Sequence, residues 1–360
     1  MKQALAERML AEVMRWDVGR LGEEWPVLDR MARLKYDEYQ QFLPGRKFIE
    51  SLGLWLWQFK TLEEREAAYA WVKRRLVFIS TQEMRQLIES AFPDVVQPIL
   101  LRKAAGRIPN CAPHRLLKVM HSPEYQSVRR RSLFLGLSDG ARMDIFRRAA
   151  GLSNEQVWQA YEVGDPKAKR FLKDLQKEEG PDARFETIFL IDDFTASGTS
   201  YIRKDDGNWT GKIQKAVNEI PSELVTPDRE IHIILYIATT GALVHIGDHL
   251  ARFAAENPVG PVPKAAAVYT LSGQVAVSDQ HPEDAEFLRL IRGEGYYRTR
   301  PMDSHEKKGR TDDMRLGYAG CALPVVLVHN TPNNSVYLLW ANEPEAVHGL
   351  FPRVTRHKDI

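Results

Sequence analysis

Residues 188–200 have the sequence IFLIDDFTASGTS, and this stretch decides the expected fold. Its first four residues are apolar, a run that is too short for a helix and typical of a strand buried on both faces. Two adjacent acids, Asp192 and Asp193, follow at the carboxyl end of that strand. Because ligands bind just outside the carboxyl ends of strands in an open parallel sheet, the sequence predicts a binding site directly after this strand.

The segment after the acids has the composition of a phosphate-binding loop. Its residues are small and mostly carry hydroxyl donors: Thr195, Ala196, Ser197, Gly198, Thr199 and Ser200. The backbone N–H groups of such a loop can converge on a phosphate. Paired carboxylates repel a phosphate, so they favour ribose hydroxyls or a hydrated Mg²⁺ ion instead. The alternative interpretation is a buried strand that ends in a polar turn, with Asp193 as a helix N-cap.

The whole stretch resembles the signature with which type I phosphoribosyltransferases bind 5-phosphoribosyl 1-pyrophosphate (PRPP): four apolar residues, two acids and a small-residue loop. The resemblance implies that Asp192 and Asp193 bind the ribose 2′- and 3′-hydroxyls, and that residues 195–200 hold the 5′-phosphate. It also implies PRPP as the substrate and Mg²⁺ as the metal that accompanies it. No direct metal ligand is assigned.

A second motif, Ser138-Asp139-Gly140-Ala141-Arg142, follows the apolar run SLFLGL at 132–137. In phosphoribosyltransferases the loop at this place contacts the pyrophosphate of PRPP, so the resemblance implies the same role here. Gly140 permits close approach of the backbone, and Arg142 offers a forked donor to a phosphate. Asp139 either positions a metal through water or caps the next helix. For the motif as a whole, a common strand–loop–helix turn is the alternative.

The third motif, HNTPNN at 329–334, follows the apolar run PVVLV. We expect its polar side chains to face the substrate cleft and select the second substrate: His329, Asn330, Asn333 and Asn334. Amides can read a hydrogen-bonding edge, although asparagine and proline also form plain turns. The strand with HNTPNN resembles the C-terminal part of uncharacterised bacterial phosphoribosyltransferase-like proteins of conflict and antiphage loci, retron-type systems among them. Those proteins also carry an LSDGAR-like loop and a DDF-type signature, so the similarity spans about 130–340.

The order of the elements predicts an α/β fold. Short apolar runs alternate with helical stretches from about residue 126 onward, which favours a parallel sheet covered on both faces. The runs are expected as strands at 132–137, 188–191, 231–238, 266–271 and 324–330. We therefore expect a type I phosphoribosyltransferase-like domain at 126–360, a parallel sheet flanked by helices. An N-terminal all-helical domain is expected at 1–125, with Thr61 and Thr81 as two of its N-caps.

Composition limits the class of protein. The chain of 360 residues is 44% hydrophobic and 27% charged, as in an ordinary soluble globular protein. A formal net charge of +2 gives no global case for nucleic-acid binding. The chain has only two cysteines, so a disulfide framework is excluded. No stretch approaches the ~20 apolar residues of a membrane span, so we expect a cytoplasmic protein without a membrane partner.

These observations predict an enzyme, a pentosyltransferase that acts with PRPP and Mg²⁺ at the ribose C1. The resemblance places it as an effector in bacterial antiviral defence, with PRPP or a related ribose-phosphate nucleotide as ligand. Protein, RNA or DNA partners of a defence system are left open. Two alternatives also stay open: a non-catalytic nucleotide-sensing module that retains the cradle, and a hydrolase of the N-glycosidic bond in nucleosides or nucleotides.

Overall fold

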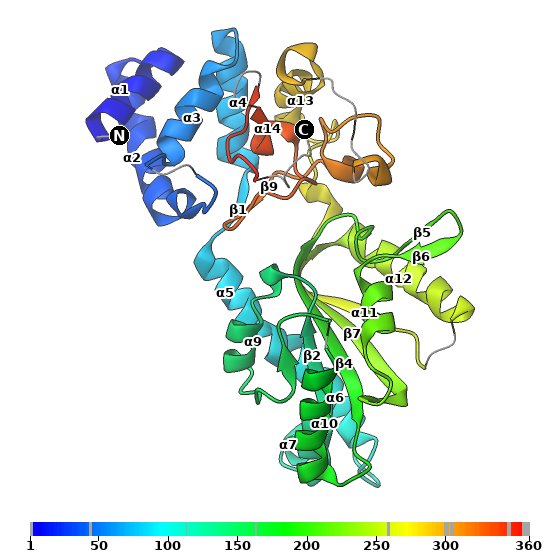
Figure 1. Ribbon diagram of the computed structural model, residues 1–360. Helices are drawn as coiled ribbons and strands as arrows, with labels where there is room; N and C mark the ends of the chain where they lie inside the picture. The colour runs from blue at the N-terminus through cyan, green and yellow to red at the C-terminus, as the bar shows by residue number, and fades with distance from the viewer. Residues whose placement is uncertain are drawn as a thin grey trace. The chain divides into compact units, whose positions relative to one another are not determined.

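The computed structural model describes residues 3–42, 45–112, 114–162, 164–257, 260–298, 302, 306–343 and 347–354. The chain forms two compact units, drawn in Figure 1. The first unit combines Met1–Glu83 with Gln274–Ile360, and the second unit is Met84–Gly273. These bounds do not coincide with the expected division near residue 125, because each end of the chain contributes to the first unit.

The second unit is built on a five-stranded sheet with the order β3-β2-β4-β7-β8. All its strand pairs are parallel, and β4 lies at the centre. The strands are β2 (Ser132–Gly136), β3 (Val157–Trp158), β4 (Phe185–Thr195), β7 (Val225–Thr239) and β8 (Lys264–Leu271). The predicted α/β fold with a parallel sheet between helices is confirmed.

One face of this sheet packs against three helices that follow its strands in sequence. They are α10 (Asp165–Glu179), α11 (Lys212–Glu219) and α12 (Thr240–Glu256). Leu133, Leu190 and Ile233 point into this layer and are fully buried, together with Phe171 of α10 and Ile246 of α12. Figure 1 shows α10 and α11 lying along β4 and α12 beside them. The all-apolar strands are explained by cover on both faces.

The opposite face is covered mostly by helices within the region that the sequence assigned to the N-terminal domain, together with α9 (Met143–Ala149) from the expected phosphoribosyltransferase-like domain. Phe134 of β2 stacks on Phe189 of β4 at 4.9 Å between ring centroids, and Phe134 also contacts Phe146 of α9. Phe146 in turn meets Phe92 at 6.5 Å. The elements of this layer are α5 (Thr81–Ser90), a π-helix (Ala91–Val96), α6 (Gln97–Ala105), α7 (Leu116–Met120), α8 (Pro123–Arg130) and α9 (Met143–Ala149). Residues 84–130 therefore pack against the sheet of the second unit.

The first unit begins with four helices and is completed by the C-terminal segment. The helices are α1 (Gln3–Met14), α2 (Val18–Leu34), α3 (Phe48–Trp57) and α4 (Leu62–Arg75). The later elements are α13 (Ala285–Arg292), α14 (Tyr337–Trp340), β10 (Asn342–Glu343) and β11 (Val347–His348). Figure 1 shows the red C-terminal segment among the blue helices. The N-terminal region is helical as expected.

Phe351 joins the two ends of the chain in this core. Its fully buried ring contacts a set of aromatic rings from the N-terminal part: Tyr36, Tyr39, Phe42, Phe48 and Phe78. The indole of Trp55 also donates a hydrogen bond to the Leu338 carbonyl at 2.7 Å. The N-terminal helices therefore depend on residues near the C-terminus for their packing.

Two local expectations are wrong and one is confirmed. The run at 324–330 forms β9 (Val325–Leu327), but β9 pairs in parallel with β1 (Val77–Ile79) and not with the main sheet. Thr61 caps α4 as expected, since its side chain accepts from the Glu64 N–H. Thr81 is not the cap of α5, because the Ser80 hydroxyl accepts the Glu83 N–H instead. Within the described ranges, no helix has the length and apolar composition needed to cross a bilayer.

Replacing Phe351 by alanine is expected to destabilise the first unit by about 3–5 kcal/mol, because the lost ring leaves a cavity among five aromatic neighbours. Hydrogen exchange should then accelerate in α3, which packs against this ring. Val354→Ala, at a residue that is 56% exposed, is the control. Unchanged exchange in α3 of the Phe351 variant would show that the C-terminal segment is not part of this core.

Candidate functional site

The two predicted phosphoribosyl motifs meet at the carboxyl ends of adjacent strands. β2 and β4 pair in parallel with Gly136 opposite Ile191, and the Leu137 N–H donates to the Ile191 carbonyl at 2.8 Å. The loop 138–142 therefore starts beside the acids. Its Ser138 hydroxyl donates a hydrogen bond to Asp192 Oδ1. A Cβ at Gly140 would overlap the Asp193 carboxylate in its present position, so the two motifs approach each other closely at this glycine.

Asp192 is fully buried, and both of its carboxylate oxygens have protein donors. Oδ1 accepts from the Ser138 hydroxyl and from the Asp193 N–H at 3.2 Å. Oδ2 accepts from the Tyr201 hydroxyl at 2.6 Å and from the Lys212 ammonium at 2.5 Å. The sequence predicted that Asp192 contacts ribose, whereas this geometry gives it internal partners.

The groups around Asp192 shift its pKa in opposite directions. Burial raises the pKa of Asp192, and the neighbouring charge of Asp193 raises it further, while Lys212 and Ser138 lower it by stabilising the carboxylate. Burial also raises the pKa of Tyr201 well above its ordinary value, so its hydroxyl stays protonated and acts as a donor. Lys212 is thus the one cation that offsets the buried carboxylate in this group of contacts.

The sequence did not predict that Tyr201 and Lys212 contact Asp192. After the loop, a short hairpin of β5 (Arg203–Asp205) and β6 (Asn208–Thr210) leads to α11. Gly211 has φ +126°, and a side chain there would collide with the Tyr201 carbonyl. The Lys212 N–H donates to the Ser200 carbonyl at 3.1 Å, which holds the start of α11 against the loop.

The predicted phosphate loop is a tight turn fixed against the start of α12. The Gly198 N–H donates to Thr195 Oγ1 at 3.2 Å, and Gly198 has φ +74°. A Cβ at Gly198 would lie 2.9 Å from the Ala242 carbonyl oxygen. The Thr239 hydroxyl, which caps α12, donates to the Ala196 carbonyl at 2.6 Å. Ser197 and Thr199 bond to each other through their hydroxyls at 3.0 Å, and Ser200 is exposed.

Asp193 lies within β4, is half-buried, and accepts the Phe194 N–H at 2.8 Å. It is therefore not the N-cap that the alternative interpretation required. In the neighbouring loop Asp139 is exposed and does not cap α9. Arg142 adopts the left-handed conformation with φ 44°.

The loop 138–142 is held by a hydrogen bond from β7, and it carries one arginine, Arg142. The buried Tyr236 hydroxyl of β7 donates to the Ala141 carbonyl at 2.6 Å. Arg142 is partly exposed, and its guanidinium makes no hydrogen bond or ion pair with any described residue. A partly exposed arginine beside two acids is suited to an anionic ligand that carries a metal ion.

The third motif lies in the first unit. The side-chain amide of Asn334 donates to the Tyr318 carbonyl at 3.2 Å and to the Cys321 sulfur at 3.4 Å. The His329 carbonyl accepts from the side-chain amide of Gln41 at 2.7 Å, and the Asn330 N–H donates to the Leu327 carbonyl at 3.1 Å. Asn334 therefore helps to shape the turn. That the turn faces the phosphoribosyl site stays a prediction.

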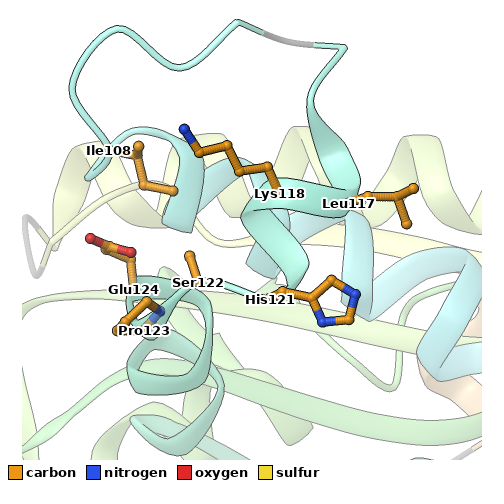
Figure 2. A pocket seen from close by; sticks show the side chains of 7 residues that line it. All are labelled: Ile108, Leu117, Lys118, His121, Ser122, Pro123 and Glu124. Atoms are coloured by element: carbon orange, nitrogen blue, oxygen red, sulfur yellow. The ribbon is translucent and has the colours of Figure 1, made fainter.

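A hollow of about 580 Å³ lies elsewhere in the second unit, within residues 108–124. Figure 2 shows its lining side chains, among them Ile108, Lys118, His121 and Glu124. None of its lining residues belongs to the predicted motifs. Among the residues that the structure describes, no group of three or more His, Cys, Asp or Glu side chains could hold a metal ion.

Lys212→Met is expected to destabilise the protein by about 1–3 kcal/mol near pH 8 and by less near pH 5. Without the ammonium, the already raised pKa of Asp192 rises further, so the folded variant at high pH must bury an unpaired carboxylate or take up a proton. In the unfolded chain the carboxylate is solvated, so neither cost arises. The stability that the variant loses relative to the wild type therefore becomes smaller as the pH falls toward the ordinary pKa of an aspartate. Urea unfolding at both pH values measures this, with Lys212→Arg as the charge-retaining control. An equal loss at both pH values would assign the contact to packing.

Comparison with known protein families gives one match. The PRTase-CE family model matches residues 53–353, a range that includes all three motifs. No curated protein and no solved structure matches the chain. Because the match extends over parts of both compact units and not over the sheet alone, the chain belongs to the PRTase-CE family of phosphoribosyltransferase-like proteins.

Proposed function

We propose that this chain is a phosphoribosyltransferase-like enzyme that binds PRPP with Mg²⁺ in its second unit and reacts at the ribose C1. The observation that carries the proposal is the junction of the two motifs, where Gly140 lies against Asp193 and Ser138 donates to Asp192. Two sequence segments about fifty residues apart, each expected to hold one phosphate end of PRPP, thereby form one site.

The two acids have different tasks in this proposal. Asp193 is half-buried at the strand end and binds the ribose hydroxyls. Asp192 has a positioning role, because its carboxylate oxygens hold the side chains of Ser138, Tyr201 and Lys212 in place. The backbone N–H groups and hydroxyls of residues 195–200 hold the 5′-phosphate.

The leaving pyrophosphate lies against the loop 138–142, where Arg142 offers a forked donor. The exposed carboxylate of Asp139 and that of Asp193 provide oxygen ligands of the kind Mg²⁺ prefers. When bound, Mg²⁺ neutralises charge on the pyrophosphate. In the reaction the bond between C1 and the pyrophosphate oxygen breaks, and a bond forms between C1 and the acceptor. The residues contribute position and charge, so no protein nucleophile is needed.

A non-catalytic nucleotide-binding module is the second candidate, and one observation favours it. Both oxygens of Asp192 are occupied by protein donors, as in a site that binds without reacting. The two candidates differ in pyrophosphate release from PRPP. If water is the acceptor, ribose 5-phosphate accompanies the pyrophosphate, which identifies a hydrolase acting at the same carbon.

We also propose an effector role in bacterial antiviral defence. It is supported by the resemblance of the motifs at 137–142, 192–194 and 329–334 to proteins of antiphage loci. Phage plaque counts on cells that express the wild-type chain or its Asp193→Asn variant test this role. Equal plaque counts for the two would contradict an effector that acts through this site.

Calorimetry should show Mg²⁺-dependent binding of PRPP that Gly198→Glu weakens more than tenfold, since about 1.4 kcal/mol lost is tenfold. The new side chain would meet the start of α12 and place a carboxylate in the phosphate loop. Gly247→Glu is the matched control, because a side chain at that position of α12 meets nothing within 4 Å. Equal affinity in the two variants would remove residues 195–200 from the binding site.

Asp193→Asn is expected to lower pyrophosphate release by about a hundredfold or more, while the fold is retained. The variant keeps the shape of the side chain and removes the charge that holds ribose or metal-bound water. The assay incubates the protein with PRPP, Mg²⁺ and pooled nucleobases and follows products by mass spectrometry. Asp248→Asn, an exposed position on α12, controls for the loss of one charge. Full activity of Asp193→Asn would leave the binding module as the better candidate.

Alanine variants of Asn333 and Asn334 test whether the 329–334 turn has a functional or a structural role. Asn334→Ala should cost about 1–3 kcal/mol of stability, since it removes the donor to the buried Tyr318 carbonyl. Asn333→Ala should instead alter acceptor preference while PRPP affinity and stability stay unchanged. Thermal unfolding and product profiles measure the two effects. If Asn333→Ala left the product profile unaltered, the turn would have a structural role only.

A further inference from the structure

The second unit has a hollow of about 570 Å³ at the end of the sheet opposite to the predicted phosphoribosyl site. Its lining comes from the residue before β4, the turn before β7, the first residues of β7 and Gly260 before β8. Phe185, which starts β4, pairs with Val225, whereas Asp192 lies seven positions further along the strand. The hollow is therefore separate from the loops 138–142 and 195–200.

Arg229 is one of the residues that line this hollow. Its Nε is buried and has no hydrogen-bond partner, and its guanidinium forms no ion pair among the described residues. Burial lowers the pKa of Arg229, which reflects the cost of holding this charge away from water. Thr226 lines the same hollow, and its Oγ1 is also buried without a partner. Each of these two residues thus lines the hollow and also carries a buried polar atom without a hydrogen-bond partner in the protein, which is costly unless a bound group or a rearrangement satisfies it.

The charged side chains that line the hollow are two arginines and one acid, and the exposed Asp228 beside Arg229 in sequence is not among them. Arg184 lines it, is exposed, and forms no ion pair with a described residue. Glu223 is the one acid of the lining, and it too makes no ion pair there. Glu230, next to Arg229 in sequence, is bound by Lys103 at 3.0 Å and by His232 at 3.3 Å. Two arginines thus face a single carboxylate.

We propose that this hollow binds a phosphate-bearing small molecule, as a second anion site independent of the phosphoribosyl site. Arg229 and Arg184 supply forked donors that match phosphate oxygens, and Thr226 and Ser222 supply hydroxyl donors. The volume lies within the range of pockets for small molecules, so it accommodates a nucleoside monophosphate as well as inorganic phosphate. The proposal does not rest on PRPP chemistry, since none of its residues belongs to that site.

Hydrogen exchange of the full chain, followed by mass spectrometry, reports the two sites separately. Inorganic phosphate and adenosine 5′-monophosphate are titrated at constant ionic strength, with adenosine as the neutral control. Phosphate should slow exchange in residues 222–229, and adenosine should not. Tighter protection by the monophosphate identifies a nucleotide as the ligand, and equal protection identifies phosphate alone. Protection at 195–200 reports the phosphoribosyl site independently.

Arg229→Gln should weaken this phosphate binding about tenfold or more, since a charge-assisted bond is lost. Arg229→Lys should lose part of the affinity because it keeps the charge without the fork, and Glu223→Gln should bind phosphate more tightly. Arg252→Gln is the matched control, at an exposed arginine of α12 that forms no ion pair with a described residue, and it should bind as the wild type does.

Three results would overturn the proposal. The first is absence of protection at 222–229 by either phosphate compound in the folded wild-type chain. The second is equal binding by wild type and Arg229→Gln. The third is a stability coupling between Arg229→Gln and Glu223→Gln in a double-mutant cycle, which would identify Glu223 as the counter-ion that Arg229 uses in solution.

Discussion

The buried carboxylate of Asp192 is the constraint on which the candidate site depends. A fully buried charge is stable only when donors surround it, and here those donors come from three separate places: Ser138 after β2, Tyr201 after the loop 195–200 and Lys212 at the start of α11. Each contact fixes one part of the site. The position of the loops thus follows from the need to satisfy one carboxylate.

The same contacts determine what charge the site presents outward. Because Lys212 offsets Asp192 inside the protein, the acid pair presents the half-buried Asp193 and not two carboxylates of equal exposure. A ligand with two phosphate groups is strongly anionic, and a pair of uncompensated acids would repel it. The internal lysine thereby leaves one acid of the pair to face the anionic ligand that we propose. Arg142, which has no protein anion among the described residues, acts in the same direction.

The sequence predicted those features that are encoded within a few adjacent residues. The buried strand 188–191, the small-residue loop 195–200 and the loop after β2 all follow from local composition, and the structure has a strand and loops at these places. Lys212 was missed because a hairpin separates it from Asp192 by 20 positions. The unit boundaries were missed because Phe351 packs on rings more than 270 residues away, such as Phe78. Helical periodicity in 84–125 gives no information on whether the apolar side meets other helices or a sheet.

The position of Phe351 also has a consequence for synthesis of the chain. The helices at 3–75 are synthesised long before the ring that fills their core, since Tyr39 precedes its acceptor on Phe351 by 312 positions. The second unit, by contrast, is continuous in sequence and has all its strands once residue 271 has emerged. Domains generally fold as units during translation. We therefore expect the second unit to fold before the helices at 3–75 have a complete core, and these helices stay exposed to chaperones until Phe351 has been synthesised.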